Sequence, residues 1–208
     1  GYFDDPAATR AAIDADGFLW VATHDGLARF DGREFSVYDA AAYPEMGGNR
    51  IQSVYRDARG QVYALGGGGE WLRVHSQRIE RLRLDPVDAD ARVLHVVADP
   101  LCITLRRGLY CAEAEGMRLR RSIDPALNVE LAVPDGARDW LIAPDGRGWR
   151  CRQEACAALA PLPHLPRRDA DTPMQSQPYQ NDLLLGFADG LLRVSASEPP
   201  MWIVRSTG

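Results

Sequence analysis

Short runs of alternating apolar and polar residues, bounded by turns that contain glycine and aspartate, recur along this chain. The clearest example covers residues 13–38, where three runs alternate like strands: Phe18 to Thr23, Leu27 to Phe30 and Glu34 to Tyr38. The turns between them are expected at Asp16-Gly17, His24-Asp25-Gly26 and Asp31-Gly32. Glycine adopts positive φ angles without steric cost, and β-branched and aromatic residues suit a half-buried sheet. The stretch therefore predicts an antiparallel sheet of three or four strands.

Weaker copies of this pattern follow at intervals of about 40 residues. We expect five repeat units, which cover residues 10–40, 50–84, 92–122, 138–160 and 180–205. A Pro-rich stretch at residues 161–178 interrupts the pattern and is expected to form a long loop between two units, with an interdomain linker as the alternative. No helical periodicity is sustained, and repeats of about 40 residues with four short strands are typical of propeller blades. The predicted fold is all-β, a β-propeller of four-stranded antiparallel blades.

Composition and charge narrow the classes of partner. The chain has 208 residues, of which 46% are hydrophobic, and a formal net charge of −5. An acidic balance argues against nucleic acid as a partner, because phosphate-binding surfaces carry a basic excess. No apolar run approaches the roughly 20 residues that span a bilayer, and no charged-then-apolar leader begins the chain. We therefore expect no membrane contact within this chain.

Residues 14–32 carry a motif that later units keep only in part. Their sequence, D-x-D-G-F-L-W-V-A-T-x-D-G-L-x-R-F-D-G, resembles the repeat of two-component regulator propellers. In the second and third units Val62-Tyr63 and Leu101-Cys102 stand where the motif has Leu-Trp. The resemblance implies a periplasmic sensor domain of a hybrid histidine kinase or a membrane-bound diguanylate cyclase, with any enzymatic activity outside this region. It also implies seven blades or more in each propeller, so about five blades indicate either a piece of a longer sensor or an unusually small propeller.

The four cysteines fall in two expected hairpins. If the turns are two-residue and centred on residues 106–107 and 153–154, Cys102 faces Cys111 and Cys151 faces Cys156 at non-hydrogen-bonded positions, where a cross-strand disulfide is possible. Free buried thiols and a metal site are the alternatives, although the spacings are not those of a zinc site and no histidine accompanies either pair. Disulfides would place the chain in an oxidising compartment, in agreement with the periplasm.

No catalytic motif is present. Gly66 to Gly69 lacks the Lys-Ser/Thr of a phosphate-binding loop, and we expect it to form a blade turn. Asp14-x-Asp16-Gly17 begins like a calcium loop, but Phe18 and Trp20 occupy later ligand positions, which favours a turn cap. Tryptophans could form a sugar platform, yet Trp20 stands at the position that packs between blades. We therefore expect no cofactor, no metal and no catalytic residue.

Binding residues are expected on one face of the propeller. There the loops between the second and third strands converge with the loops that connect successive blades, around the central channel. The expected ligand-binding residues are His24, Asp25, Tyr43, Glu45, Asn49, Arg106, Arg107, Arg152, Glu154 and Asp189. The arginines favour an anionic ligand, because guanidinium groups bind carboxylates or sulfates through two parallel hydrogen bonds.

The sequence therefore favours a non-catalytic sensor that binds an unidentified small molecule or a periplasmic protein. A propeller enzyme of the lyase or glycosidase type is the first alternative, and it would require His24 and Glu154 to converge as an acid–base pair. A scaffold or homodimerisation module is the second alternative, because an incomplete propeller leaves unpaired edges.

Overall fold

The computed structural model describes residues 11–84, 93–163, 175–187 and 190–205. Within these ranges the chain folds into five four-stranded antiparallel sheets, in which every strand pairs with its neighbour in the chain. Two short 3₁₀ helices, η1 (Pro44–Met46) and η3 (Pro125–Leu127), are the helices found in the same ranges. No described helix has the length and apolar character needed to cross a membrane. The sheets are the blades of a β-propeller, as the repeat pattern predicts.

The blades are numbered in chain order. Blade 1 consists of β1 (Ala11–Ile13), β2 (Leu19–Ala22), β3 (Leu27–Phe30) and β4 (Phe35–Tyr38). Blade 2 consists of β5 (Ile51–Arg56), β6 (Val62–Gly66), β7 (Trp71–Val74) and β8 (Ile79–Leu82). Blade 3 consists of β9 (His95–Ala98), β10 (Leu101–Leu105), β11 (Gly108–Glu113) and β12 (Gly116–Ser122). Blade 4 consists of β13 (Leu131–Asp135), β14 (Arg138–Ile142), β15 (Gly148–Arg152) and β16 (Ala155–Ala158). Blade 5 consists of β17 (Gln175–Tyr179), β18 (Asp182–Phe187), β19 (Gly190–Ser195) and β20 (Met201–Arg205).

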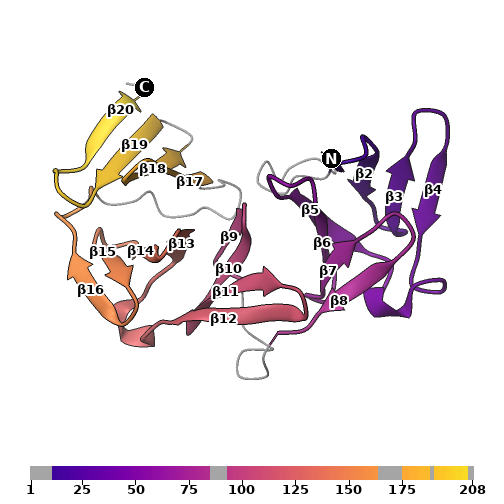
Figure 1. Cartoon of the computed structure of the whole chain (residues 1–208), viewed down its shortest axis with the longest axis horizontal. Coiled ribbons are helices and arrows are strands. Elements are labelled where there is room, and N and C mark those ends of the chain that lie inside the picture. The colour runs from indigo at the N-terminus through magenta and orange to yellow at the C-terminus, as the bar shows by residue number, and fades with distance from the viewer. Residues whose placement is uncertain (1–10, 85–92, 164–174, 188–189, 206–208) are drawn as a thin grey trace.

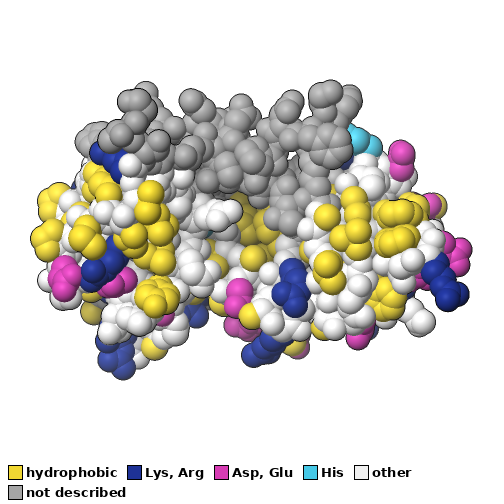
Figure 2. Space-filling model, turned by 90° about the horizontal axis from the view of Figure 1, so that it is seen from above, with side chains coloured by type: hydrophobic (Ala, Val, Ile, Leu, Met, Phe, Trp, Pro, Cys, Tyr) yellow, Lys and Arg dark blue, Asp and Glu magenta, His cyan; other side chains and the backbone are white. Residues whose placement is uncertain are grey.

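The blades follow one another along an arc, with blade 1 at one end and blade 5 at the other (Figure 1). In blades 2 to 5 the first strand lies on the inside of the arc and the fourth on the outside. The core lies between adjacent blades, where Trp20, Trp71 and Trp140 are at most 2% exposed. The prediction that Trp20 packs between blades is therefore confirmed. Hydrophobic side chains also show on both flanks of the molecule, where the arc ends (Figure 2).

One cross-strand pair recurs at the same register position between the second and third strands of every blade. In four blades the third strand carries an arginine opposite an aromatic or aliphatic residue of the second strand, and in blade 3 a cysteine pair takes the place of both. The pairs are Trp20 with Arg29, Tyr63 with Arg73, Cys102 with Cys111, Trp140 with Arg150, and Leu184 with Arg193. The third unit therefore keeps the register of the repeat although it loses the motif.

Both predicted disulfides are present in the structure. Cys102 pairs with Cys111 in the β10–β11 hairpin, and Cys151 with Cys156 in the β15–β16 hairpin. Each hairpin has the two-residue turn that the prediction requires, and the Cα atoms of each pair lie 4.0 Å apart. The described residues contain no free cysteine. The free-thiol and metal alternatives are therefore set aside for these four residues.

Two strands lie outside the expected repeat units. Blade 4 begins with β13, before the unit expected at residues 138–160, and β17 of blade 5 lies partly inside the expected Pro-rich loop at 161–178. Pro134 and Pro178 interrupt the strand signal in these two segments, because proline cannot donate to a sheet. Each is nevertheless the first strand of its sheet and therefore an edge strand, where one side of the backbone needs no partner. Residues 164–174 of the expected loop lie outside the described ranges.

Candidate functional site

One end of the blades gathers most of the expected binding residues. Neighbouring strands are antiparallel, so the turns between second and third strands leave each sheet at the same end as the connections between blades. We call this end the loop face, and it comprises residues 23–26, 39–50, 67–70, 106–107, 123–130 and 143–147. The Ile51 N–H donates to the Thr23 carbonyl oxygen at 2.9 Å, and the Gly67 N–H donates to the Arg50 carbonyl oxygen at 2.7 Å. The connection between blades 1 and 2 is therefore fixed to a turn of each blade.

The turn at residues 23–26 presents His24 and Asp25 to solvent. The Thr23 hydroxyl donates to the Gly26 carbonyl oxygen at 2.7 Å and accepts from the Asp25 N–H at 3.2 Å. Gly26 has a φ of +143°, and a Cβ atom there would lie 2.3 Å from the Tyr38 carbonyl oxygen. Only glycine fits this backbone, so the turn holds both exposed side chains on a rigid support.

The connection at residues 39–50 does not place its three expected binding residues in a shared site. Tyr43 is half-buried, with its ring 5.2 Å from that of Tyr38 in the core between blades 1 and 2. The Asn49 side-chain oxygen accepts from the Ala40 N–H at 2.9 Å and so braces the connection. Glu45 is exposed on η1, which packs against β8, the outermost strand of blade 2. Tyr43 and Asn49 hold the loop, and Glu45 lies at the periphery of the arc.

Arg106 and Arg107 form an exposed two-residue turn on the loop face of blade 3. The Arg107 carbonyl oxygen accepts from the Ile123 N–H at 2.8 Å, so the turn is anchored to the next connection. Across the described ranges, no ion pair involves either guanidinium group. Two adjacent cations on a fixed turn are suited to bind a carboxylate or a sulfate. Asp189 of the fifth blade lies outside the described residues.

Arg152 and Glu154 lie at the opposite end of the blades. The β15–β16 turn that holds them joins the third and fourth strands of blade 4, so it leaves the sheet away from the loop face. The expectation was wrong because β13 was not recognised, so that β14 was taken for the first strand of this blade and each later turn was assigned to the wrong pair of strands. The loop-face turn of blade 4 is residues 143–147, where Arg147 Nε donates to Asp145 Oδ2 at 2.7 Å. Hydrogen bonds from the Arg147 backbone N–H and side chain lower the pKa of Asp145.

The acid–base pair that a propeller enzyme would need is not assembled. His24 lies on the loop face, whereas Glu154 lies at the other end of a different blade, so the two side chains do not converge. In the ranges that the structure describes, no group of three or more His, Cys, Asp or Glu residues is arranged to hold a metal ion. The structure therefore does not bring together the pair on which the enzyme alternative depends.

Glu70 is a loop-face residue that the sequence reasoning missed. Its carboxylate folds over the glycine-rich turn, where Oε2 accepts from the Gly68 N–H at 3.0 Å. A Cβ atom at Gly66 or Gly68 would lie 2.5 Å from a Glu70 oxygen, so these glycines leave room for the acid. The side-chain oxygen Oε1 is also 3.9 Å from Arg81 Nη2. The turn is therefore filled by the chain's own anion, which argues against a phosphate there.

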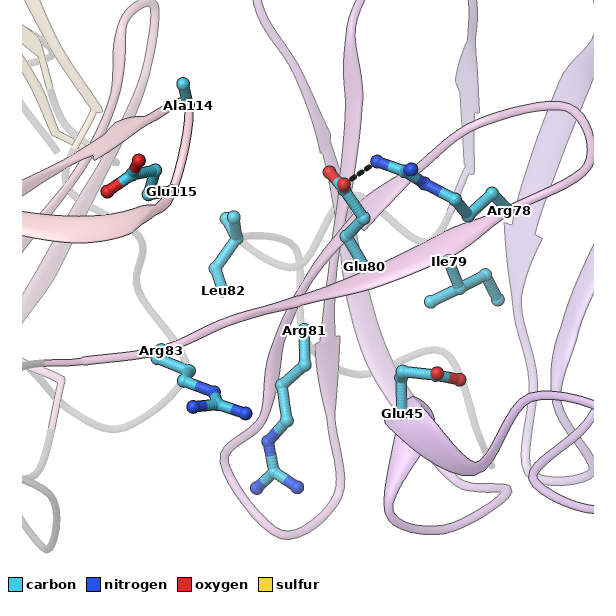
Figure 3. Close-up of a pocket in the computed structure, with 9 residues that line it drawn as sticks. All are labelled: Glu45, Arg78, Ile79, Glu80, Arg81, Leu82, Arg83, Ala114 and Glu115. Atoms are coloured by element: carbon cyan, nitrogen blue, oxygen red, sulfur yellow. Dashed lines mark ion pairs between the residues drawn. The ribbon is translucent and has the colours of Figure 1, made fainter.

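A shallow groove of about 470 Å³ lies at the periphery, beside β8 and the β11–β12 turn (Figure 3). Its lining carries both signs of charge, with three arginines and three glutamates among the residues labelled in Figure 3. Arg78 and Glu80 form an ion pair across its rim. Burial, followed by the nearby Arg78 and Arg73, lowers the pKa of the adjacent His75. The charges largely neutralise one another, and the groove presents no convergent set of groups for a ligand.

No protein-family model matches the chain, and no curated protein matches it in sequence. Solved structures match its fold. The extracellular domains of two hybrid two-component systems from B. thetaiotaomicron are similar, one with a TM-score of 0.59 at 18% identity and the other with 0.58 at 15% identity. Each match covers 95% of this chain, but only 30% and 31% of those domains. YCF48 from Cyanidioschyzon merolae also matches, with a TM-score of 0.55 at 15% identity over 88% of this chain and 67% of that one. The chain thus shares its fold with these proteins and spans about a third of the length of the two-component domains.

Proposed function

We propose that this chain is part of the periplasmic sensor domain of a bacterial signal-transduction receptor of the two-component regulator propeller family. The observation that carries the proposal is the match of 95% of the chain to extracellular domains of hybrid two-component systems. The motif at residues 14–32 supports it independently. The two disulfides agree with an oxidising compartment outside the cytoplasm.

In this proposal the chain binds a signal and performs no chemistry. The binding groups are the exposed residues of the loop face, above all Arg106 and Arg107, with His24 and Asp25 on the turn of blade 1. The arginine turn is rigid and has no ion pair with the described residues, so a ligand would not have to displace one. The ligand class that fits is a small carboxylate or sulfate. Any kinase or cyclase activity would belong to another part of the receptor.

The experiment is a thermal-shift screen with dicarboxylates, sulfate and sulfated or acidic sugars. A ligand that binds the folded state raises the melting temperature, and the stabilisation grows with the logarithm of 1 + [L]/Kd. Two variants are compared with the wild type: Arg106→Gln, on the loop face, and Arg152→Gln, which changes another exposed arginine beside the β15–β16 turn at the opposite end. We expect Arg106→Gln to weaken binding about tenfold or more, which is the loss of one charge-assisted hydrogen bond, and Arg152→Gln to leave it unchanged.

Equal losses in both variants would show that the anion responds to net charge and would contradict a loop-face site. A shift that neither substitution changes would place the ligand elsewhere on the chain. If no small anion shifts the melting temperature and a periplasmic protein is captured in an Arg106-dependent manner, the signal is a protein and the small-molecule form of the proposal fails.

A further inference from the structure

The two disulfides differ in how far they are open to solvent, although each joins neighbouring strands of a hairpin. Cys102 is fully buried in the core that blade 3 shares with blade 4, and its partner Cys111 is half-buried against the same core. Cys151 is fully buried as well, but its partner Cys156 lies on β16, the outermost strand of blade 4, where all four residues are exposed. A thiol opens a disulfide only by reaching one of its two sulfur atoms. Of the two pairs, Cys151–Cys156 is therefore the one that the folded chain leaves open to attack, on its Cys156 side.

The Cys151–Cys156 disulfide lies beside the polar contact that joins blade 3 to blade 4. Cys151 stands directly opposite Asp139 of β14 in the sheet, so the two side chains are on the same face. Asp139 accepts from Arg120 Nε at 2.6 Å and from Arg121 Nε at 2.5 Å, and both arginines belong to β12 of blade 3. The disulfide is therefore on the face of blade 4 that meets blade 3.

The hairpin that this disulfide closes supplies a second group to the same contact. In its two-residue turn, the Gln153 carbonyl oxygen accepts from Arg121 Nη1 at 2.5 Å. Gln153 has a φ of +49°, in the left-handed region that residues other than glycine rarely adopt. The disulfide lies one residue pair from this turn, next to Arg152 and Ala155, and so fixes the two strands that hold the turn in place. Arg121 thus depends on the hairpin for one of its contacts with blade 4.

We propose that the Cys151–Cys156 disulfide is a thiol-exchange site, and that its opening by a dithiol loosens the contact between blades 3 and 4. A thiolate of the dithiol attacks Cys156 Sγ, the S–S bond breaks, and Cys151 leaves as a thiolate that takes up a proton. The second thiol of the dithiol then attacks the mixed disulfide, which releases Cys156 as a thiol and turns the dithiol into its own disulfide. In sum, two electrons and two protons pass from the dithiol to the chain.

The expected effect of opening is local. Without the covalent bond beside the turn, Gln153 relaxes from its left-handed conformation, and its carbonyl oxygen no longer accepts from Arg121. The ion pairs with Asp139 remain, because β14 is held by its pairing with β13 and does not need the disulfide. The turn lies at the end of blade 4 opposite the loop face, so the proposal is independent of the ligand proposed there.

Differential thiol labelling of the folded wild-type chain tests the exchange. The chain is incubated with dithiothreitol well below its melting temperature, and the thiols that form are blocked with N-ethylmaleimide at successive times. The remaining disulfides are then reduced after denaturation and labelled with a heavy isotopic form, so that peptide mass spectrometry gives the opening rate of each pair. We expect Cys151–Cys156 to open at least about tenfold faster than Cys102–Cys111, because the shielded pair reacts only when the structure around it opens. Equal rates, faster opening of Cys102–Cys111, or resistance of both pairs would overturn the proposal.

Hydrogen exchange of the selectively reduced chain tests the effect on the contact. Exchange should rise about threefold or more in peptides from β12, β15 and β16, and stay unchanged in blade 2. Cys151→Ala/Cys156→Ala is the matched variant, which should exchange like the reduced wild type and no longer respond to dithiothreitol. A chain in which Cys151–Cys156 is open while β12 exchanges as before would overturn the link to blade 3.

Discussion

Individual residues show why the repeat tolerates loss of its motif. Trp140 Nε1 donates to Asp135 Oδ2 at 3.3 Å, and the Arg150 guanidinium lies 3.9 Å from the centre of the Trp140 ring. In blade 1 the corresponding indole, on Trp20, donates to Asp14 Oδ2 at 2.8 Å. Asp14 also accepts through Oδ1 from two backbone N–H groups of its turn, so it is a turn cap, as the sequence predicts, and its oxygens are occupied. Asp14, the first residue of the sequence that resembles a calcium loop, therefore serves packing and turn geometry.

The same residues show how far the sequence could predict the site. Trp20 and its turn were identifiable because both stand at fixed positions of the repeat motif at residues 14–32. Glu70 was not identifiable, because its role depends on glycines that approach it only after the turn has folded. Asn49 and Tyr43 were expected to bind a ligand because they are polar loop residues, and composition alone does not distinguish a residue that braces a loop from one that faces a ligand.

Asp139 is the first residue at which we expect a large effect on stability. Its side chain is 4% exposed, and it accepts from Arg120 Nε at 2.6 Å and from Arg121 Nε at 2.5 Å, which joins the outer strand of blade 3 to blade 4. Asp139→Ala should destabilise the fold by about 3–5 kcal/mol, because it removes the buried carboxylate that the Arg120 and Arg121 guanidinium groups share. Urea denaturation measures the change. Asp145→Ala is the control, since its ion pair with Arg147 is exposed, and an equal loss there would contradict the role of burial.

Gly26 should be the glycine least tolerant of substitution in blade 1. Gly26→Ala adds a Cβ atom 2.3 Å from the Tyr38 carbonyl oxygen at a φ of +143°, so we expect a loss of about 2 kcal/mol or more. Gly17→Ala is the matched control: its φ is +88° and nothing lies within 4 Å, so only the backbone strain of about 1 kcal/mol applies. Thermal and urea denaturation of the two variants compare them, and equal losses would mean that the turn relaxes to accept the methyl group.

At the scale of elements, the hairpins were predictable and the inner strands of two blades were not. Turn residues and alternation specify β10–β11 and β15–β16 closely enough to predict their register, and the disulfides follow from it. β13 and β17 each contain proline, and their position at an inner sheet edge becomes apparent only from the fold. Because β13 was not recognised, the turn between the third and fourth strands of blade 4 was taken for the turn between its second and third strands. Arg152 and Glu154 were therefore assigned to the wrong end of the blade.

The two disulfides should contribute unequally although both close short loops. In the chain-entropy model each contributes ~2–3 kcal/mol by restricting the unfolded state. Cys102 and Cys151 are both fully buried in the core, but their partners differ: Cys111 is half-buried and packs against that core, whereas Cys156 is exposed on the outermost strand of blade 4. Cys102→Ala/Cys111→Ala should therefore cost more than Cys151→Ala/Cys156→Ala, because both of its truncations remove packed atoms.

Urea denaturation of both double variants under oxidising conditions measures the difference. Thiol titration of the denatured wild-type protein, without reductant, provides the control and should detect no free thiol. A thiol signal would contradict the pairing, and a larger loss for Cys151→Ala/Cys156→Ala would show that core packing does not set the order.

At the scale of the whole molecule, the blades in the middle of the arc should be more stable than those at its ends. Blades 2, 3 and 4 contact a neighbour through both faces, whereas blades 1 and 5 each leave one face uncovered by described residues. In such repeat arrays stability is close to a sum of blade and interface contributions, so the terminal blades should open first. The repeat pattern predicts the cores between blades. The strand register is needed to see that the uncovered face of blade 1 is apolar whereas that of blade 5 carries both polar and apolar residues.

Hydrogen exchange measured by mass spectrometry tests this gradient of stability along the arc. At low protein concentration, peptides from β6, β10 and β14 should exchange most slowly, and peptides from β4 and β20 should exchange faster than the other strands, because an exposed face gives little protection to the strand beneath it. Uniform protection of all five blades at low concentration would show that the uncovered faces do not weaken the ends of the arc.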